Sequence, residues 1–239
     1  MGEIGFSRFD AITIDCYGTL IDLEQGILNA LQPVLAPHEI DVGEDELLER
    51  YARHEAALEA GAYLPYRDVL AESVRGLCGE FGFSPSDDDA RGFAQAIGNW
   101  PAFHDTAPAL RRLHERFRLG VITNCDRDLF ALSNRRLGVT FDWVVTAQDA
   151  GAYKPSHTPF ELAFETIDVP RDRILHAAQS LFHDHVPGKK LGLTTAWVDR
   201  RHGRPGSGAT PPASATPDLT VPDMRTLADV ALGTGARPT

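Results

Sequence analysis

Cysteine is scarce in this chain, and long apolar runs are missing from it. The 239 residues include three cysteines, Cys16, Cys78 and Cys125, which form no CxxC pair and are odd in number. This argues against a disulfide framework and predicts a reducing, cytoplasmic location. No stretch approaches the roughly 18 apolar residues of a membrane span, and the acidic opening MGEIGFSRFD lacks the apolar segment of a signal peptide.

Positive charge is also in short supply. Lys and Arg number 23 against 34 Asp and Glu, which gives a formal net charge of -11. Nucleic acids and anionic membranes bind clustered Lys and Arg, so neither is an expected partner. A small anionic substrate remains possible, because one basic residue can dominate a cleft. Hydrophobic content of 43% and charged content of 24% are ordinary for a soluble globular enzyme.

From residue 98 onward, short apolar segments alternate with helix-like ones. Strands are predicted at 11–15, 119–124, 141–147, 174–180, 194–199 and 218–221. Helices are predicted at 107–117, 128–138, 157–167, 185–192 and 224–232. Strands that alternate with helices indicate βαβ units, so the expected fold class is α/β with a doubly wound parallel sheet.

An all-helical stretch interrupts this pattern after the first strand. Helices are predicted at 44–61 and 66–82, each closing on Gly, and a third begins at Ser86 or Asp87. We therefore expect an α/β core of residues 1–20 and 98–239, with residues 21–97 inserted as a lid above the carboxyl end of the first strand. The Pro- and Gly-rich segment 200–217 is predicted to be a mobile loop.

Polar side chains stand where the predicted strands end. Parallel sheets bind ligands at the carboxyl ends of their strands, so these residues mark the expected site. They are Asp15, Thr123, Asn124, Thr146 with the nearby Lys154, Gln179, Ser180 and Asp199, and Asp184 follows Gln179 by five residues. Each also has a structural explanation: Thr123 and Asn124 can form a turn, Lys154 can lie in a surface loop, and Asp184 can cap a helix. The run His183-Asp184-His185 leaves a metal site as a further alternative.

Taken together, these residues resemble the signatures of the haloacid dehalogenase superfamily. The matching segments are DCYGTL (15–20), ITN (122–124), YKP (153–155) and AAQSLFHD (177–184). The resemblance covers essentially the whole chain. It implies a Rossmann-like core with an inserted helical cap, and it makes Asp15 the nucleophile of a covalent mechanism.

Two positions separate the branches of that superfamily. Its phosphatases carry a second Asp two residues after the nucleophile as general acid, whereas this chain has Tyr17, a phenol with a reference pKa near ~10. They also bind Mg²⁺ through acids in the fourth signature, where this chain has Gln179. A halide leaves without a proton and without Mg²⁺, so both positions favour the 2-haloacid dehalogenase branch, which shows Tyr at the same place.

The resemblance also implies roles for the site residues. Asp15 attacks the halogen-bearing carbon, Lys154 keeps the nucleophile ionised, and Asp184 is the general base for water. Donors expected to hold the carboxylate and the developing oxyanion are Thr19, Thr123 and Asn124, and Tyr17 is expected to wall an apolar pocket. In the dehalogenases a cap Arg receives the halide. Here the candidates are Arg50 and Arg53, which stand at i, i+3 on one predicted helix, and then Arg67.

The fourth signature departs from the dehalogenase pattern. Gln179 and Leu181 stand where those enzymes usually carry Ser and Asn, so the hydrogen bonds around the hydrolytic water must differ. No cofactor is expected. The alternatives are a small-molecule phosphatase, which would use Mg²⁺ and an aspartyl-phosphate, and a non-catalytic binding protein that keeps the pocket. Capped folds of this kind often dimerise, which makes a homodimer possible.

Overall fold

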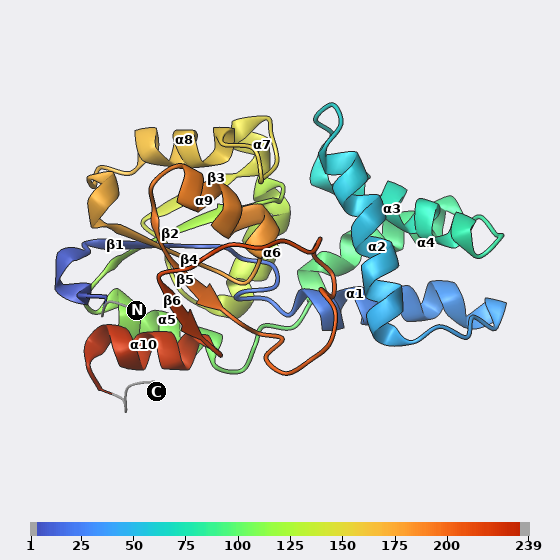
Figure 1. The fold of residues 1–239 in the computed structure, drawn as a ribbon. Helices are drawn as coiled ribbons and strands as arrows, with labels where there is room; N and C mark the ends of the chain where they lie inside the picture. Colours follow the sequence, from blue (N-terminus) through green and yellow to red (C-terminus); the bar gives the residue numbers. More distant parts are fainter. Residues whose placement is uncertain (1–3, 235–239) are drawn as a thin grey trace.

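The structure is a computed structural model that describes residues 4–234, and its centre is a parallel sheet (Figure 1). Its strands are β1 (Ala11–Ile14), β2 (Arg118–Thr123), β3 (Trp143–Thr146), β4 (Ile174–Ala178), β5 (Thr194–Val198) and β6 (Leu219–Val221). The order is β3-β2-β1-β4-β5-β6, so β1 lies between β2 and β4. Ile14 pairs with Val121 on one side and Ala177 on the other, which brings the ends of the three central strands to one edge.

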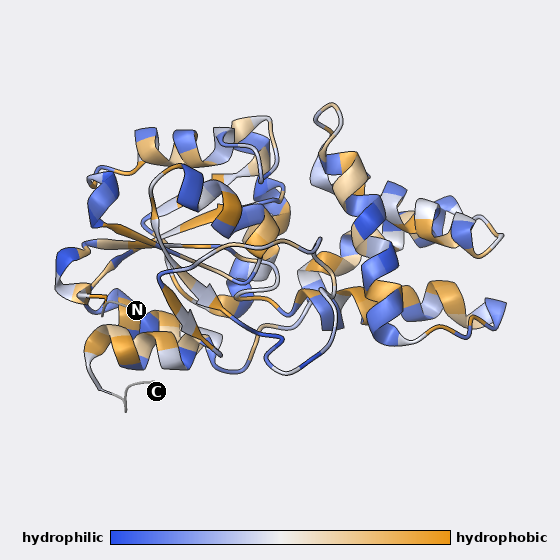
Figure 2. Cartoon of the chain, in the orientation of Figure 1, coloured by the Kyte–Doolittle hydropathy of each residue, from blue (hydrophilic) through white to orange (hydrophobic). Residues whose placement is uncertain are grey.

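Both faces of the sheet are covered by helices, as the apolar strands require (Figures 1 and 2). One cluster joins Ile12 and Ile14 of β1 to α5 (Thr106–His114), α6 (Arg127–Leu137) and α10 (Met224–Leu232). The other joins Ala11 and Ile122 to Phe160 of α8 (Thr158–Thr166). The short helices α7 (Ala147–Ala150) and α9 (Val186–Lys190) follow β3 and β4. The predicted α/β fold class is confirmed.

Four further helices form a group beside the sheet, which we call the helical group (Figure 1). They are α1 (Leu23–Leu35), α2 (Glu44–Glu59), α3 (Tyr66–Glu80) and α4 (Asp87–Gln95). Ser86 caps α4 by accepting a hydrogen bond from the backbone N–H of Asp89, while the Asp89 carboxylate accepts one from the backbone N–H of Ser86. Three acids in the first turn of α4 suit the positive end of the helix dipole, which explains that cluster without a metal.

The segment between β5 and β6 contains no helix or strand from residue 199 to 218, as predicted for a loop. Ion pairs and a hydrogen bond join this loop to the helical group. The buried Arg201 forms ion pairs with Glu24 of α1 (2.6 Å) and Asp45 of α2 (2.9 Å), and Ser207 N donates to the Glu49 carboxylate (3.1 Å). The loop therefore connects the sheet to α1 and α2. Its predicted mobility stays a prediction.

A helix needs about 20 apolar residues to cross a lipid bilayer. Among residues 4–234, no helix is both long enough and apolar enough to cross one.

Candidate active site

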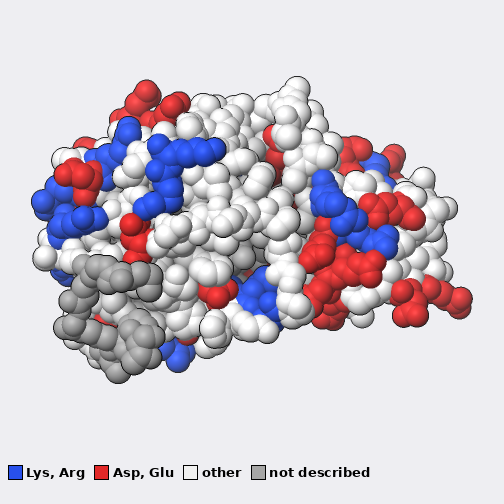
Figure 3. Space-filling view, in the orientation of Figure 1, with Lys and Arg blue, Asp and Glu red and all other residues white. Residues whose placement is uncertain are grey.

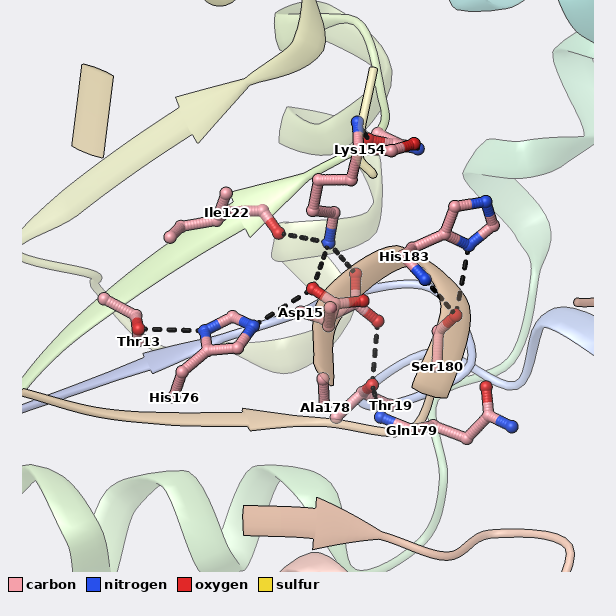
Figure 4. Close-up of polar contacts among 12 residues, drawn as sticks. Thr13, Asp15, Thr19, Ile122, Lys154, His176, Ala178, Gln179, Ser180 and His183 are labelled. Atoms are coloured by element: carbon pink, nitrogen blue, oxygen red, sulfur yellow. Dashed lines mark hydrogen bonds and ion pairs between the residues drawn. The ribbon is translucent and has the colours of Figure 1, made fainter. Parts of the chain in front are cut away.

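A buried lysine joins two carboxylates at the carboxyl edge of the sheet (Figure 4). Lys154 Nζ lies 2.8 Å from Asp15 Oδ1, which follows β1, and 2.7 Å from Asp184 Oδ1, in the turn after β4. It also donates to the Ile122 carbonyl at 2.9 Å, so all three of its N–H bonds have acceptors. The strand ends therefore bring together the predicted nucleophile, cation and base.

Burial and pairing oppose each other in this trio. Burial alone would lower the pKa of Lys154, but the attraction of Asp15 and Asp184 outweighs it and raises that pKa above the ordinary value. Burial would raise the pKa of Asp184, but Lys154 and His176 hold it far below its ordinary value. For Asp15, burial raises the pKa, Lys154 opposes the rise and Asp184 adds to it. The lysine charge is what makes two adjacent carboxylates tolerable here.

The turn after β1 fixes the second oxygen of Asp15. Thr19 Oγ1 donates to Asp15 Oδ2 at 2.8 Å and accepts from the Gln179 backbone N–H at 2.9 Å. Gly18 has a φ of 92°, which lets the chain reverse so that Leu20 N and Ile21 N both donate to the Cys16 carbonyl. The predicted contact of Thr19 with the nucleophile is present.

Asp184 has a second partner that the sequence did not suggest. His176 Nε2 lies 3.0 Å from Asp184 Oδ1, and His176 Nδ1 lies 2.9 Å from Thr13 Oγ1. Thr13 and His176 occupy paired positions on β1 and β4, so this chain of contacts is built into the sheet. Asp184 Oδ2 is buried and has no hydrogen-bond partner among the described residues. It is a free acceptor beside the nucleophile.

Tyr17 is a wall of the site and is unsuited to proton transfer. Its hydroxyl is 2.9 Å from Ser133 Oγ and accepts from the Cys125 thiol at 3.5 Å, and its ring packs edge-on against Trp100. Burial raises the pKa of Tyr17 well above its ordinary value, and Cys125 adds to the rise. The phenol therefore stays protonated and turned toward α6.

Thr123 and Asn124 do not hold the nucleophile in the way that was expected. Asn124 Oδ1 accepts from Lys154 N (2.8 Å), and Asn124 Nδ2 donates to the Lys154 carbonyl (3.0 Å), so Asn124 fixes the backbone of the lysine. Thr123 is buried with its hydroxyl unpartnered among the described residues. Thr123 is the last residue of β2, whereas Asn124 comes after the strand and lines the pocket over Asp15.

The comparison with known proteins agrees with this geometry. The family model of haloacid dehalogenase-like hydrolases matches residues 9–177, well over half of the chain. The chain belongs to the haloacid dehalogenase-like hydrolases. A relative from Pseudomonas putida, an (S)-2-haloacid dehalogenase, is 25% identical over 82% of this chain and 87% of its own length. Haloacetate dehalogenase H-2 of a Moraxella strain is 24% identical over 91% of this chain and 95% of its own.

Solved structures support the fold of this hydrolase. The L-2-haloacid dehalogenase of Xanthobacter autotrophicus, solved with chloropropionic acid covalently bound, superposes with a TM-score of 0.79. It is 20% identical, and the match covers 95% of this chain and all of that one.

The pocket over Asp15 is small, about 30 Å³, and lies between the sheet edge and the helical group. Its walls are Asp15, Tyr17, Leu23, Glu55, Glu59, Tyr66, Asn124, Lys154, Ser180, His183, Asp184, Ala209 and Thr210. No Arg belongs to this lining. The helical group contributes two carboxylates instead, Glu55 and Glu59, which were not predicted from the sequence.

Arg50 and Arg53 lie elsewhere, which corrects the expectation that they face the nucleophile. Arg50 pairs with Glu46 (2.5 Å) and Glu80 (3.1 Å) inside the helical group. The Arg53 side chain is 62% exposed and reaches Glu80 only at 3.8 Å. Arg67 joins α3 to the start of α6 through Asp126 and Asp128. Arg50 and Arg53 therefore pair within the helical group, and Arg67 joins that group to α6.

Gln179 is also displaced from its expected role. Its backbone N–H reaches Thr19, but its side chain lines a larger cleft of about 840 Å³ between α2 and the loop after β5. Arg53 and Trp197 line the same cleft, and Trp197 Nε1 donates to the Gln179 carbonyl (2.8 Å). The side chain of Gln179 is thus not among the walls of the pocket over Asp15.

The placement of Arg50 gives a first prediction. Arg50→Gln should leave kcat/KM for any substrate of this site within about twofold of wild type. Its side chain contacts Glu46, Glu80 and the Phe81 ring, and none of these lines the pocket over Asp15. Steady-state kinetics measure this. A loss of more than about tenfold (≈ 1.4 kcal/mol) would show that Arg50 reaches the substrate, against the contacts described.

Proposed function

We propose that this hydrolase cleaves the carbon–halogen bond of small 2-haloacids through an ester formed on Asp15. The observation that carries the proposal is Lys154 between Asp15 and Asp184, combined with a tyrosine where a phosphatase would need an acid. The relatives from Pseudomonas putida and Moraxella are dehalogenases by name, which supports the same chemistry.

The first step forms the ester and releases halide. Asp15 attacks the halogen-bearing carbon, a carbon–oxygen bond forms, and the halide leaves with the bonding electron pair. Burial raises the pKa of Asp15, and Lys154 opposes that rise and so favours the anionic form, while Thr19 orients the second oxygen. The departing halide needs no proton, which is consistent with the protonated, buried Tyr17 at this position.

The second step hydrolyses the ester and regenerates the free Asp15 side chain. Water attacks the carbonyl carbon of the Asp15 ester and gives one proton to Asp184. The bond between that carbonyl carbon and the oxygen on the former halogen-bearing carbon then breaks, and the leaving oxygen takes the proton from Asp184 to give the 2-hydroxyacid. Asp15 releases the remaining water proton to solvent and is again a carboxylate. Asp184 Oδ2 has the free acceptor site that such a water requires, while Lys154 and His176 hold the other oxygen. Neither step needs a metal or cofactor.

We also propose that residues 21–97 act as the cap of a core formed by 1–20 and 98–239. The pocket over Asp15 has walls from both parts, including Glu55 and Tyr66 from the proposed cap.

A cytoplasmic location and a homodimer stay predictions. Sedimentation of the purified protein measures whether it forms a homodimer.

Halide release tests the proposal directly. With EDTA and no added Mg²⁺, the protein should release halide from chloroacetate, fluoroacetate or 2-chloropropionate. In a single turnover in ¹⁸O-water, label should enter Asp15 while the first product stays unlabelled, because the product oxygen comes from the carboxylate.

Two results would contradict it. Label in the first product would mean direct attack by water on carbon. Absence of halide from all three acids, together with Mg²⁺-dependent phosphate release from phosphomonoesters, would establish the phosphatase alternative.

A further inference from the structure

The pocket over Asp15 holds more acid than base. Its lining has four carboxylates, Asp15, Glu55, Glu59 and Asp184, against Lys154 and His183. Acidic side chains also gather over the helical group on the face in Figure 3. Lys154 is already shared by two carboxylates. An anionic substrate therefore needs a further cation, and His183 is the one that remains in the lining.

The contacts of His183 fix its ring and leave one nitrogen available (Figure 4). Its backbone N–H donates to Ser180 Oγ (3.0 Å), and Nδ1 lies 3.1 Å from the same oxygen. Nε2 lies 3.4 Å from Glu59 Oε2, but no hydrogen bond with good geometry forms among the described residues, although the atom is buried. A buried N–H without a satisfied acceptor is costly, so it favours a ligand that supplies one.

The groups around His183 favour its charged form. Glu59 and Glu55 of α2 face it, Asp184 follows it in the chain, and Lys154 and the Tyr66 hydroxyl complete the lining. Burial alone would lower the pKa of His183, but Glu59 and Asp184 outweigh it and raise that pKa, with Lys154 opposing. The ring is thus cationic over a wider pH range than a free histidine.

Glu55 holds a proton in the same range. Its Oε1 accepts from the hydroxyls of Tyr51 (3.0 Å) and Tyr66 (2.9 Å). Burial and the neighbouring Glu59 nevertheless raise the pKa of Glu55 to about 7. Below that pH the pocket loses one negative charge, which further favours an anion.

We propose that protonated His183 binds the carboxylate of the substrate through Nε2, and that Glu59 keeps the ring charged. The identification of a haloacid as substrate rests on the proposed function. A halide leaves on the side of the carbon opposite Asp15, whereas His183 belongs to the same turn as Asp184 and lines the same pocket as Asp15. This position suits the carboxylate of the substrate.

Binding of propionate, an unreactive carboxylate, tests this without any turnover. Calorimetry on the whole protein should show affinity that is highest at low pH and falls as His183 loses its proton. His183→Gln should weaken binding at about pH 6 by roughly tenfold or more and abolish most of the pH dependence. His114→Gln, on α5 and outside the pocket, should match wild type.

Two further variants separate the contributions of the acids. Glu59→Gln should move the midpoint of the pH dependence to lower pH while His183 is intact, because the ring loses its anionic neighbour. In Glu55→Gln, propionate affinity should still fall with rising pH as His183 loses its proton. The part of the fall that comes from ionisation of Glu55 should be absent. An unmoved midpoint in Glu59→Gln would overturn the role of Glu59. Thermal melts identify any variant that is unfolded.

The outcomes that overturn the proposal are specific. Propionate affinity in His183→Gln equal to wild type would do so, as would failure of the wild-type protein to bind propionate. Sodium chloride binding that weakens in His183→Gln while propionate binding does not would assign the residue to the halide instead. Absence of halide release with intact, His183-dependent propionate binding would sink the proposed reaction but not this carboxylate site.

Discussion

Replacing Lys154 with Met is expected to lower halide release at neutral pH by roughly 10²-fold or more and to move the remaining activity to alkaline pH. Without the ammonium, Asp15 and Asp184 are buried next to each other with no neutralising charge. Both carboxyl pKa values then rise, so ionised Asp15 becomes available only at higher pH. The wild-type protein should reach its maximal rate of halide release at a lower pH than Lys154→Met. Rates of halide release measured across pH test the prediction.

The same substitution should reduce stability. Removing one partner of a buried ion pair typically costs about 3–5 kcal/mol, because the remaining charges stay desolvated. Urea denaturation measures the change in the free energy of unfolding. Lys189→Met is the matched control: Lys189 pairs with the partly exposed Asp218, so both activity and stability should change little. A Lys154→Met protein with wild-type kinetics and pH profile would show that Asp15 does not depend on the lysine.

The buried trio of Asp15, Lys154 and Asp184 was predictable from sequence because parallel strands end at one edge. Asp15, Lys154 and Asp184 come from three separate connections of the chain, yet strand order alone brings them within contact distance. The resemblance to the haloacid dehalogenase signatures implied that Lys154 acts on Asp15, and a buried carboxylate requires a partner of this kind. Local chemistry and topology agree there, so the residues could be found without coordinates.

The residues that the helical group contributes to the site could not be predicted from the sequence in the same way. Arg50 and Arg53 were chosen for their charge, but the buried face of α2 runs through Leu48, Tyr51 and Glu55. Glu55 continues the apolar spacing of α2 at i+4 from Tyr51. An acid at such a position was the one feature of the sequence that could have indicated a carboxylate facing the site. Which face meets the nucleophile depends on how α2 packs against the sheet edge. That is a tertiary property.

His176 and Gln179 show two other limits. His176 lies inside a buried strand, and only the register of β4 with β1 places it beside Thr13 and within reach of Asp184. A polar residue in an apolar strand is a signal, but its partner is set by the pairing. For Gln179 the backbone position was predictable, whereas the direction of a side chain beyond a strand end depends on the loop that follows β5.

Asp184→Asn should separate the two chemical steps, and its expected effect on turnover is a loss of about 10²–10⁴-fold. Asp184 is held by Lys154 and His176 through Oδ1, which leaves Oδ2 free to accept the proton of water. An amide in its place can orient water but cannot take that proton. Attack by Asp15 needs no base, so the first step should proceed.

The variant should therefore release one halide per protein rapidly and then stop as the ester. Intact-protein mass spectrometry after mixing with 2-chloropropionate should show the added mass of the 1-carboxyethyl group, and digestion should locate it on Asp15. Asp15→Asn is the control and should give neither burst nor adduct. An Asp184→Asn protein that shows no burst would mean that Asp184 acts before or during carbon–halogen cleavage. In that case the ion pair with Lys154, through which both carboxylates share one cation, would be its main contribution to catalysis.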